Sequence, residues 1–189
     1  DIKAVAFVGS SAVAKIVYSR AASSGKRALC LGGAKNHMIV VPDADQDSTA
    51  KGLLASSMGS AGQRCMAASV AVGVANVDPI INQLVHEAKN FKLGVDMGTI
   101  VSKPAFDRIT NYIDEAEKMG AKVLIDGRKA TPPEGYENGY WIGATILDNV
   151  DPEWPSATDE IFGPVLSIIR TDTLENAMKI ENGNQYGNA

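Results

Sequence analysis

The clearest sign of the fold is the stretch Ser69-Val70-Ala71-Val72-Gly73-Val74-Ala75-Asn76-Val77-Asp78-Pro79-Ile80-Ile81. Its first seven residues are valine and small residues, a composition that favours a buried strand. Pro79 suits the first turn of a helix, because a residue there needs no backbone N–H. The apolar residues that follow repeat at helical spacing: Ile80, Ile81, Leu84, Val85 and Ala88. A buried strand running into an amphipathic helix is the repeating step of an α/β fold.

The same step is predicted upstream of this stretch. Ala4–Val8 is expected to be a strand, and Ser10 or Ser11 can cap a helix that ends near residues 23–25. The apolar side of this helix is predicted to carry Val13, Ile16 and Val17. Two short buried strands are expected at 27–31 and 38–41, and Asp43 and Asp45 can cap a helix that reaches about residue 57.

Downstream, a long amphipathic helix is expected to begin near Ser102 and Pro104 and to stop at Gly120. Strand character is predicted at 122–125, 140–147 and 165–169, a polar surface excursion at 130–139, and a last helix at 174–180. Short apolar runs that alternate with amphipathic helices predict an α/β fold with a mostly parallel sheet flanked by helices.

Composition excludes several classes of function. The 189 residues carry 18 Lys and Arg against 22 Asp and Glu, a net charge of −4, so no basic face is predicted for nucleic acid or an anionic membrane. The two cysteines form no CxxC pair and there are only two histidines, so a four-ligand zinc site of the usual structural kind is not predicted and no metal is expected. No apolar run is as long as a membrane span, and we expect a protein of the cytosol or mitochondrial matrix with reduced thiols.

Both ends of the chain have the character of interrupted elements. The strand expected at residues 4–8 has no leader before it, and residues 182–189 are loop-like. These features predict a piece cut from a longer protein.

Cys65 is the strongest candidate for a reactive group. It lies in Gly59-Ser60-Ala61-Gly62-Gln63-Arg64-Cys65-Met66-Ala67, where small residues predict a thiol that is open to substrate. Arg64 and unpaired N–H groups in the turn at residues 66–69 are expected to favour the thiolate, which is the nucleophilic form. The alternative is a buried cysteine without chemistry, which is common in proteins.

Four patterns stand in fixed order along the chain: Phe7-Val8-Gly9-Ser10-Ser11, Gly32-Gly33-Ala34-Lys35-Asn36-His37, Gly62-Gln63-Arg64-Cys65 and Glu160-Ile161-Phe162-Gly163-Pro164-Val165. Together they resemble the NAD(P)-dependent aldehyde dehydrogenase superfamily, and the resemblance covers essentially the whole chain. Residues 94–102 and 139–147 resemble further blocks of that family.

The resemblance implies a role for five residues. Cys65 would attack the aldehyde carbonyl, Glu160 would hold the nicotinamide ribose of NAD, and Phe162 would pack near the nicotinamide. Ser10 would contact the cofactor diphosphate, and Arg64 would bind a substrate carboxylate. The alternatives are a solvated loop acid at Glu160, a core aromatic at Phe162, a plain helix cap at Ser10 and an ordinary surface lysine at Lys35.

One departure from the family pattern narrows the expected reaction. Hydrolytic members carry a glutamate before their Gly-Gly-Lys sequence to activate water, and this chain has Leu31 or, by another alignment, Cys30 at that position. Neither can act as such a base. Residues 33–37 and 61–67 resemble the methylmalonate-semialdehyde dehydrogenase branch, whose members transfer the acyl group to coenzyme A. A hydrolytic aldehyde dehydrogenase, a noncatalytic domain of the same fold, and a cysteine hydrolase with His37 or His86 as base are the alternatives.

The resemblance also implies a division of the chain. Residues 1–30 would be the end of an NAD-binding domain, and residues 31–189 would be the thiol-bearing catalytic domain, truncated before the oligomerisation segment. We therefore expect the isolated chain to turn over poorly or not at all, and the full-length protein to be a homo-oligomer. The choice between NAD and NADP stays open at this point, as does the choice of semialdehyde.

Overall fold

The computed structural model describes residues 1–187. The chain forms two compact units, Asp1–Ala34 and Lys35–Ala189, and each is described by itself. The boundary between them lies next to Lys35, within the second of the four sequence patterns.

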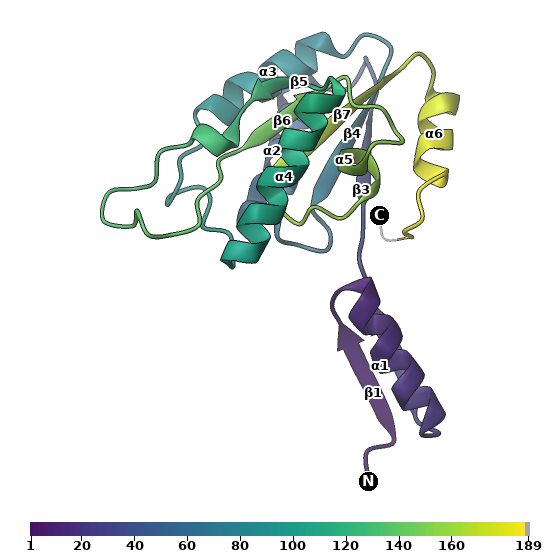
Figure 1. The fold of residues 1–189 in the computed structure, drawn as a ribbon. Helices are drawn as coiled ribbons and strands as arrows, with labels where there is room; N and C mark the ends of the chain where they lie inside the picture. Colours follow the sequence, from purple (N-terminus) through teal and green to yellow (C-terminus); the bar gives the residue numbers. More distant parts are fainter. Residues whose placement is uncertain (188–189) are drawn as a thin grey trace. The chain divides into compact units, whose positions relative to one another are not determined.

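The first unit is one strand–helix–strand step (Figure 1). Strand β1 (Ala4–Val8) pairs in parallel with β2 (Arg27–Leu31), and α1 (Ser11–Ser23) connects them. Ser10 is the N-cap of α1, and its hydroxyl accepts a bond from the N–H of Val13 at 3.5 Å. These three elements confirm the order predicted from the sequence.

The burial predicted for the strand at 27–31 is wrong, and the apolar side of α1 is accessible as well. Val13 and Ile16 on α1 are 43% and 56% exposed, and Leu29 and Leu31 on β2 are 61% and 52% exposed. In a unit of two strands and one helix, the helix packs on one face of the strands and nothing covers the other face. The apolar side chains on the uncovered sides therefore stay accessible within this unit.

The second unit is built on a five-stranded sheet in the order β3-β4-β7-β6-β5. The strands are β3 (Asn36–Val40), β4 (Ala68–Val74), β5 (Lys122–Ile125), β6 (Thr145–Asp148) and β7 (Val165–Thr171). All neighbouring pairs are parallel except β5 with β6, which is antiparallel. This confirms the prediction of a mostly parallel sheet. The strand predicted at 140–147 is shorter than expected, because residues 140–144 are irregular.

Helices lie on both sides of this sheet: α4 passes in front of it and α2 behind it (Figure 1). The helices are α2 (Gln46–Met58), α3 (Asp78–Lys89), α4 (Lys103–Met119), α5 (Pro155–Thr158) and α6 (Leu174–Asn182), with short 3₁₀ turns η1 (Gly59–Gly62) and η2 (Gly127–Lys129). Asp45 caps α2 and Ser102 caps α4, as predicted. Gly120 ends α4 with a φ of 112°, a conformation that favours glycine.

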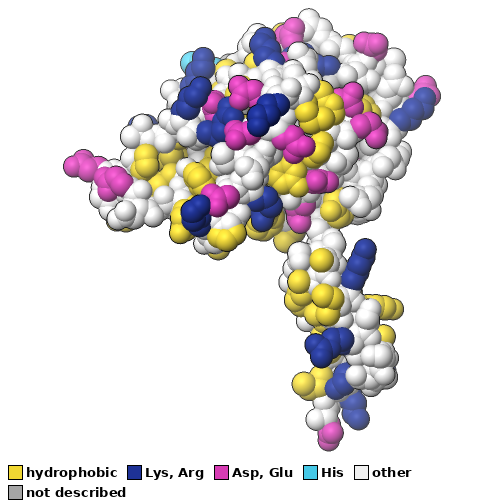
Figure 2. Space-filling view, in the orientation of Figure 1, with side chains coloured by type: hydrophobic (Ala, Val, Ile, Leu, Met, Phe, Trp, Pro, Cys, Tyr) yellow, Lys and Arg dark blue, Asp and Glu magenta, His cyan; other side chains and the backbone are white. Residues whose placement is uncertain are grey.

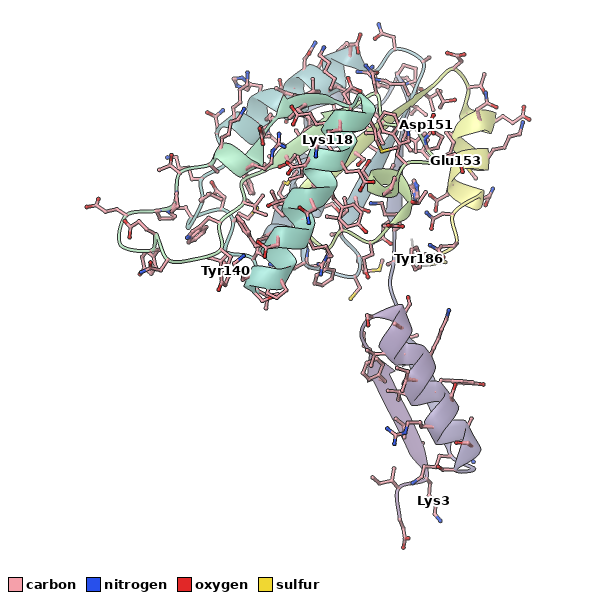
Figure 3. The ribbon with its side chains drawn as sticks, viewed as in Figure 1. Lys3, Lys118, Tyr140, Asp151, Glu153 and Tyr186 are labelled. Atoms are coloured by element: carbon pink, nitrogen blue, oxygen red, sulfur yellow. The ribbon has the colours of Figure 1, made fainter. Side chains whose placement is uncertain are left out.

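Tyr140 lies near the first turn of α4 (Figure 3), where its ring centroid is 6.3 Å from that of Phe106. The core between sheet and helices is aliphatic, with Leu53, Leu84, Ile109 and Leu166 fully buried. This packing on both faces of the sheet holds the strands in place, and with them the loops that precede the strands.

The surface shows both charge signs on the face drawn in Figure 2. On the second unit Lys and Arg side chains are interspersed with Asp and Glu, whereas the first unit shows mainly Lys and Arg. No helix within residues 1–187 is both long and apolar enough to cross a membrane. Over the same residues, His, Cys, Asp and Glu form no group of three that could hold a metal ion.

Candidate active site

Three of the four sequence patterns lie just before neighbouring strands. Lys35 and Asn36 stand at the start of β3, Cys65 precedes β4 by three residues, and residues 160–164 lead into β7. Because β3, β4 and β7 are adjacent and parallel, their amino ends share one edge of the sheet. The fold therefore gathers these patterns at the amino edge.

The loop before Cys65 has an unusual backbone. Ser60, Ala61 and Gly62 follow one another with φ values of 55°, 53° and 66°. The left-handed region costs an L residue roughly 1–2 kcal/mol, so two such non-glycine residues need support from their surroundings. Cys65 itself is exposed at the end of this loop, as predicted.

Two side chains beside the cysteine brace the loop. The Gln63 amide donates to the carbonyls of Ser60 and Thr99, at 3.3 and 3.1 Å, and accepts from the N–H of Val101 at 2.9 Å. Arg64 Nη2 donates to the carbonyls of Ala55 and Ser56 in the last turn of α2, at 2.8 and 3.0 Å. The loop is thus tied to α2 on one side and to residues 99–101 on the other.

The predicted role of the turn after Cys65 needs correction. The N–H of Ala67 donates to the carbonyl of Arg64 at 3.1 Å, and the N–H of Ala68 donates to the Ser56 hydroxyl at 3.0 Å. Both N–H groups are already bonded, one within the turn and the other to a side chain of α2. They are not the unpaired donors that the sequence was expected to supply to the thiolate.

The cysteine loop touches the Glu160–Val165 pattern directly. A Cβ atom built on Gly62 would lie 2.0 Å from the carbonyl oxygen of Gly163, so only a glycine fits at this contact. Phe162, next to it, has a φ of 55° and is 36% exposed, so it is not the core aromatic that one interpretation expected. The Cys65 loop and the Phe162 loop thus form one structural unit.

Helix α4 holds the second of these loops in place. Arg108 Nη2 donates to the carbonyl of Ile161 at 3.1 Å, and the Tyr112 hydroxyl donates to Asp159 at 2.9 Å. Burial, aided by the Asp159 carboxylate, raises the pKa of Tyr112 to about 12. Glu160 follows Asp159 and is half-buried.

Lys35 is buried, which corrects the interpretation of an ordinary surface lysine. It is 2% exposed, and its Nζ donates to the carbonyl of Ser156 at 2.9 Å. Burial lowers the pKa of the ammonium to about 7, although the carboxylates of Asp159 and Glu160 act in the opposite direction. Lys35 therefore connects the start of β3 to the segment that carries Glu160.

The remaining candidates are distributed over both units. Ser10, Cys30 and Leu31 belong to the first unit, where Ser10 caps α1 and Cys30 is half-buried on β2. His37 Nδ1 lies 2.7 Å from a carboxylate oxygen of Glu181 on α6, with 3% of its side chain exposed. His86 is exposed on α3. The contact with Glu181 accounts for His37 without a catalytic role.

Sequence reasoning missed two residues that shape the site. Asn36 donates to the carbonyls of Cys65 and Ala67, and Gln63 makes the three bonds described above. Both residues stand inside patterns that had been recognised, each beside a residue that had been assigned a role. Their position in those patterns was the only signal available, because amide side chains have no titratable group that would mark them.

Comparisons with known proteins agree with this geometry. The sequence model of the aldehyde dehydrogenase family matches residues 1–189. The chain belongs to the aldehyde dehydrogenase family. It is 44% identical to the mitochondrial acylating methylmalonate-semialdehyde/malonate-semialdehyde dehydrogenase of Rattus norvegicus, over all of this chain and 36% of that protein. It is 42% identical to the malonate-semialdehyde dehydrogenase of Pseudomonas aeruginosa, over all of this chain and 39% of that protein.

A solved structure from Sinorhizobium meliloti shares the fold. It was determined in complex with NAD, and methylmalonate-semialdehyde dehydrogenase is its proposed identity. The TM-score is 0.95 at 46% identity, over 99% of this chain and 40% of that one. This member of the aldehyde dehydrogenase family therefore spans well under half the length of the relatives it matches.

Proposed function

We propose that residues 1–189 form the thiol-bearing part of an NAD-dependent, coenzyme A-acylating semialdehyde dehydrogenase. Its substrates would be methylmalonate and malonate semialdehyde, and its products propionyl-CoA and acetyl-CoA. The observation that carries the proposal is an exposed Cys65 on a braced loop in contact with the Phe162 loop. The names of the relatives supply the substrate class.

The chemistry assigned to Cys65 is nucleophilic catalysis. Its thiolate adds to the aldehyde carbon and forms a C–S bond, and the carbonyl oxygen of this thiohemiacetal becomes an oxyanion that the Cys65 N–H can stabilise. NAD, when bound, accepts the hydride of the former aldehyde carbon, which leaves a thioester on Cys65. The thiol of coenzyme A then attacks the thioester carbon, the bond to Cys65 breaks, and Cys65 is regenerated as the thiolate. For either semialdehyde, the bond between the substrate carboxylate and the carbon next to the thioester breaks, carbon dioxide leaves, and the electron pair stays on that carbon as an enolate. A proton then takes the place of the carboxylate, which balances the proton released by the coenzyme A thiol.

The residues proposed for NAD have fitting chemistry, each within its own unit. Ser10 is exposed at the N-terminus of a 13-residue helix, a place that favours a diphosphate. Phe162 presents an accessible ring, and Glu160 a half-buried carboxylate that can accept bonds from ribose hydroxyls. We assign residues 1–30 to the end of an NAD-binding domain on the same grounds.

Arg64 is the proposed contact of the substrate carboxylate. Within the described residues its bonds to Ala55 and Ser56 use only Nη2. A guanidinium has five N–H donors in a planar fork, so the other edge of this exposed side chain can still pair with a carboxylate. The two bonds to α2 would then hold the guanidinium in position for substrate.

Coenzyme A is proposed as acyl acceptor because the water-activating carboxylate has no counterpart in the sequence. Leu31 and Cys30, the two residues that align with it, cannot serve as a base that activates water. A thiol needs less activation than water to attack a thioester. A hydrolytic enzyme with its base elsewhere, or an inactive domain, is the alternative. The protein is further proposed to work as a homo-oligomer in the cytoplasm, or in the mitochondrial matrix if eukaryotic.

The test is NADH formation from methylmalonate semialdehyde by the complete polypeptide that carries these residues, with and without coenzyme A. Turnover that requires coenzyme A and disappears in Cys65→Ala is the expected result. Turnover that is indifferent to coenzyme A contradicts the acylating reaction and leaves Cys65 as nucleophile. NADH formation that survives Cys65→Ala contradicts the proposal as a whole.

A further inference from the structure

We infer that Asn36 is a positioning residue for Cys65. Only the expected effect on turnover rests on the proposed function. The Asn36 Nδ2 donates to the carbonyl oxygen of Cys65 at 2.7 Å and to that of Ala67 at 3.0 Å. A primary amide nitrogen has two N–H donors, so both are used. They hold the Cys65–Met66 and Ala67–Ala68 peptide units, with Met66 and Ala67 between them.

An irregularity in the sheet lies beside Asn36. Asn36 pairs with Ala68 in the β3–β4 register, but His37 pairs with Val70, so β4 has one extra residue at this point. The extra residue is on β4, the strand that follows Cys65, and bulges are frequent beside active sites. Asn36 is 6% exposed, so its amide is held by packing as well as by its two bonds.

Besides the Asn36 amide, the turn after Cys65 is held by the N–H of Ala67 on the carbonyl of Arg64 and by the N–H of Ala68 on the Ser56 hydroxyl. Met66 is 60% exposed, and Cys65 is exposed as well. Gln63 and Arg64 brace the chain before the cysteine, whereas the carbonyl oxygens of residues 65 and 67 meet the Asn36 amide. Fixing the Cys65 carbonyl fixes the plane of the peptide that follows, and with it the direction of the Cα–Cβ bond that carries the thiol.

The first experiment measures the thiol itself and needs no substrate. Cys65 and Cys30 fall in different tryptic peptides, 65–89 and 28–35, so iodoacetamide labelling of each can be followed by mass spectrometry in one sample. In Asn36→Ala the labelling rate of Cys65 should change at least about threefold, while that of Cys30 should stay within the error of wild type. Equal Cys65 rates in the variant and in wild type overturn the inference.

The matched control is Asp148→Ala. Asp148 is 4% exposed and accepts two bonds from Arg170, at the opposite, carboxyl end of the parallel strands. This variant loses these two part-buried bonds and a third from the N–H of Asn149, so it reports what destabilisation alone does to Cys65. If it alters Cys65 labelling as much as Asn36→Ala does, Asn36 is a structural residue and the inference fails.

The second experiment is kinetic and uses the complete polypeptide. A 1 Å misplacement of a reacting group can cost about 100-fold in rate, so Asn36→Ala should lower kcat by about 10- to 100-fold while the KM for NAD stays within about threefold. Asp148→Ala should keep kcat within about twofold of wild type. Equal losses of kcat in the two variants overturn the inference. A wild-type enzyme without turnover overturns the proposed function alone, because the labelling result stands without it.

Asn36→Asp adds a readout that a purely structural residue would not give. Its carboxylate would face two carbonyl oxygens and donate to neither, whereas the protonated carboxyl can donate to one of them. The kcat of this variant, relative to wild type, should therefore rise as pH falls from 8 to 6. A flat ratio contradicts the inference. Asn36→Ser, which keeps one donor, replaces Asn36→Ala in both experiments if the alanine variant does not fold, with an intermediate loss as the expected result.

Discussion

Gly62→Ala should destabilise the candidate active site strongly, although it adds only one methyl group. The new Cβ would lie 2.0 Å from the carbonyl oxygen of Gly163, a distance at which the two loops must separate by about 1 Å. The φ of 66° costs an alanine about 1 kcal/mol more than a glycine, and overpacking typically adds 1–3 kcal/mol. We expect the free energy of unfolding to fall by roughly 2–4 kcal/mol.

Gly52→Ala supplies the matched control for this experiment. Gly52 lies inside α2, has an ordinary φ, and a Cβ there would meet nothing within 4 Å. Alanine should stabilise the helix at this position by about 0.5–1 kcal/mol. Urea unfolding of the two variants beside wild type should therefore give shifts of opposite sign. A Gly62→Ala variant as stable as wild type, with unchanged Cys65 labelling, would refute the contact between the two loops.

Three further substitutions test separate parts of the structure. Lys35→Met tests a buried ammonium: burial lowers the pKa of Lys35 from 10.5 to about 7, so above pH 7 the unfolded chain binds a proton that the folded chain has released. The stability of wild type relative to Lys35→Met should rise from pH 7 to 9 and level off below pH 7 in urea unfolding, and a flat difference contradicts the burial. Gln63→Ala removes three hydrogen bonds of the cysteine loop, so it should lower the unfolding free energy by about 1–3 kcal/mol and change the labelling rate of Cys65. A loss of stability with an unchanged labelling rate would show that Gln63 does not position Cys65. Gly120→Ala has room for its Cβ but not a favourable φ, so it should cost about 1 kcal/mol by thermal unfolding, and an unchanged Tm would argue against the αL cap of α4.

The elements of the fold were predictable where their signals are local. Strand β4 and helix α3 follow from a valine-rich run and from Pro79 with its apolar spacing, and α4 follows from its serine cap and Gly120. The exposure of Val13 and Leu29 was not predictable in the same way. A hydrophobic pattern shows which face of an element is apolar, but not whether another element covers it.

The geometry of the site depended on contacts that are distant in the sequence. Lysine is almost never fully buried, so the burial of Lys35 could not be expected from its sequence neighbours. The carbonyl to which its ammonium donates is 121 residues away. Three of the sequence patterns lie together at the amino edge of the sheet only because β3, β4 and β7 are neighbours, and no local sequence signal contains this strand order. The contact of Gly62 with Gly163 follows from that order, because the two loops precede adjacent strands.

The position of Cys65 before a strand explains which residues should matter most around it. Many reactive cysteines stand at a helix N-terminus, where backbone N–H groups and the helix dipole favour the thiolate. Within the described chain, residues 68–74 form β4 instead, and the N–H groups of Ala67 and Ala68 already have partners. The geometry of the thiol then depends on side chains that hold the backbone around it. The Asn36 amide bonds to the Cys65 carbonyl, and the Gln63 amide ties the loop to residues 99–101. Substitutions at these positions should therefore disturb Cys65 more than substitutions of Met66, which is exposed and adjacent to it in sequence.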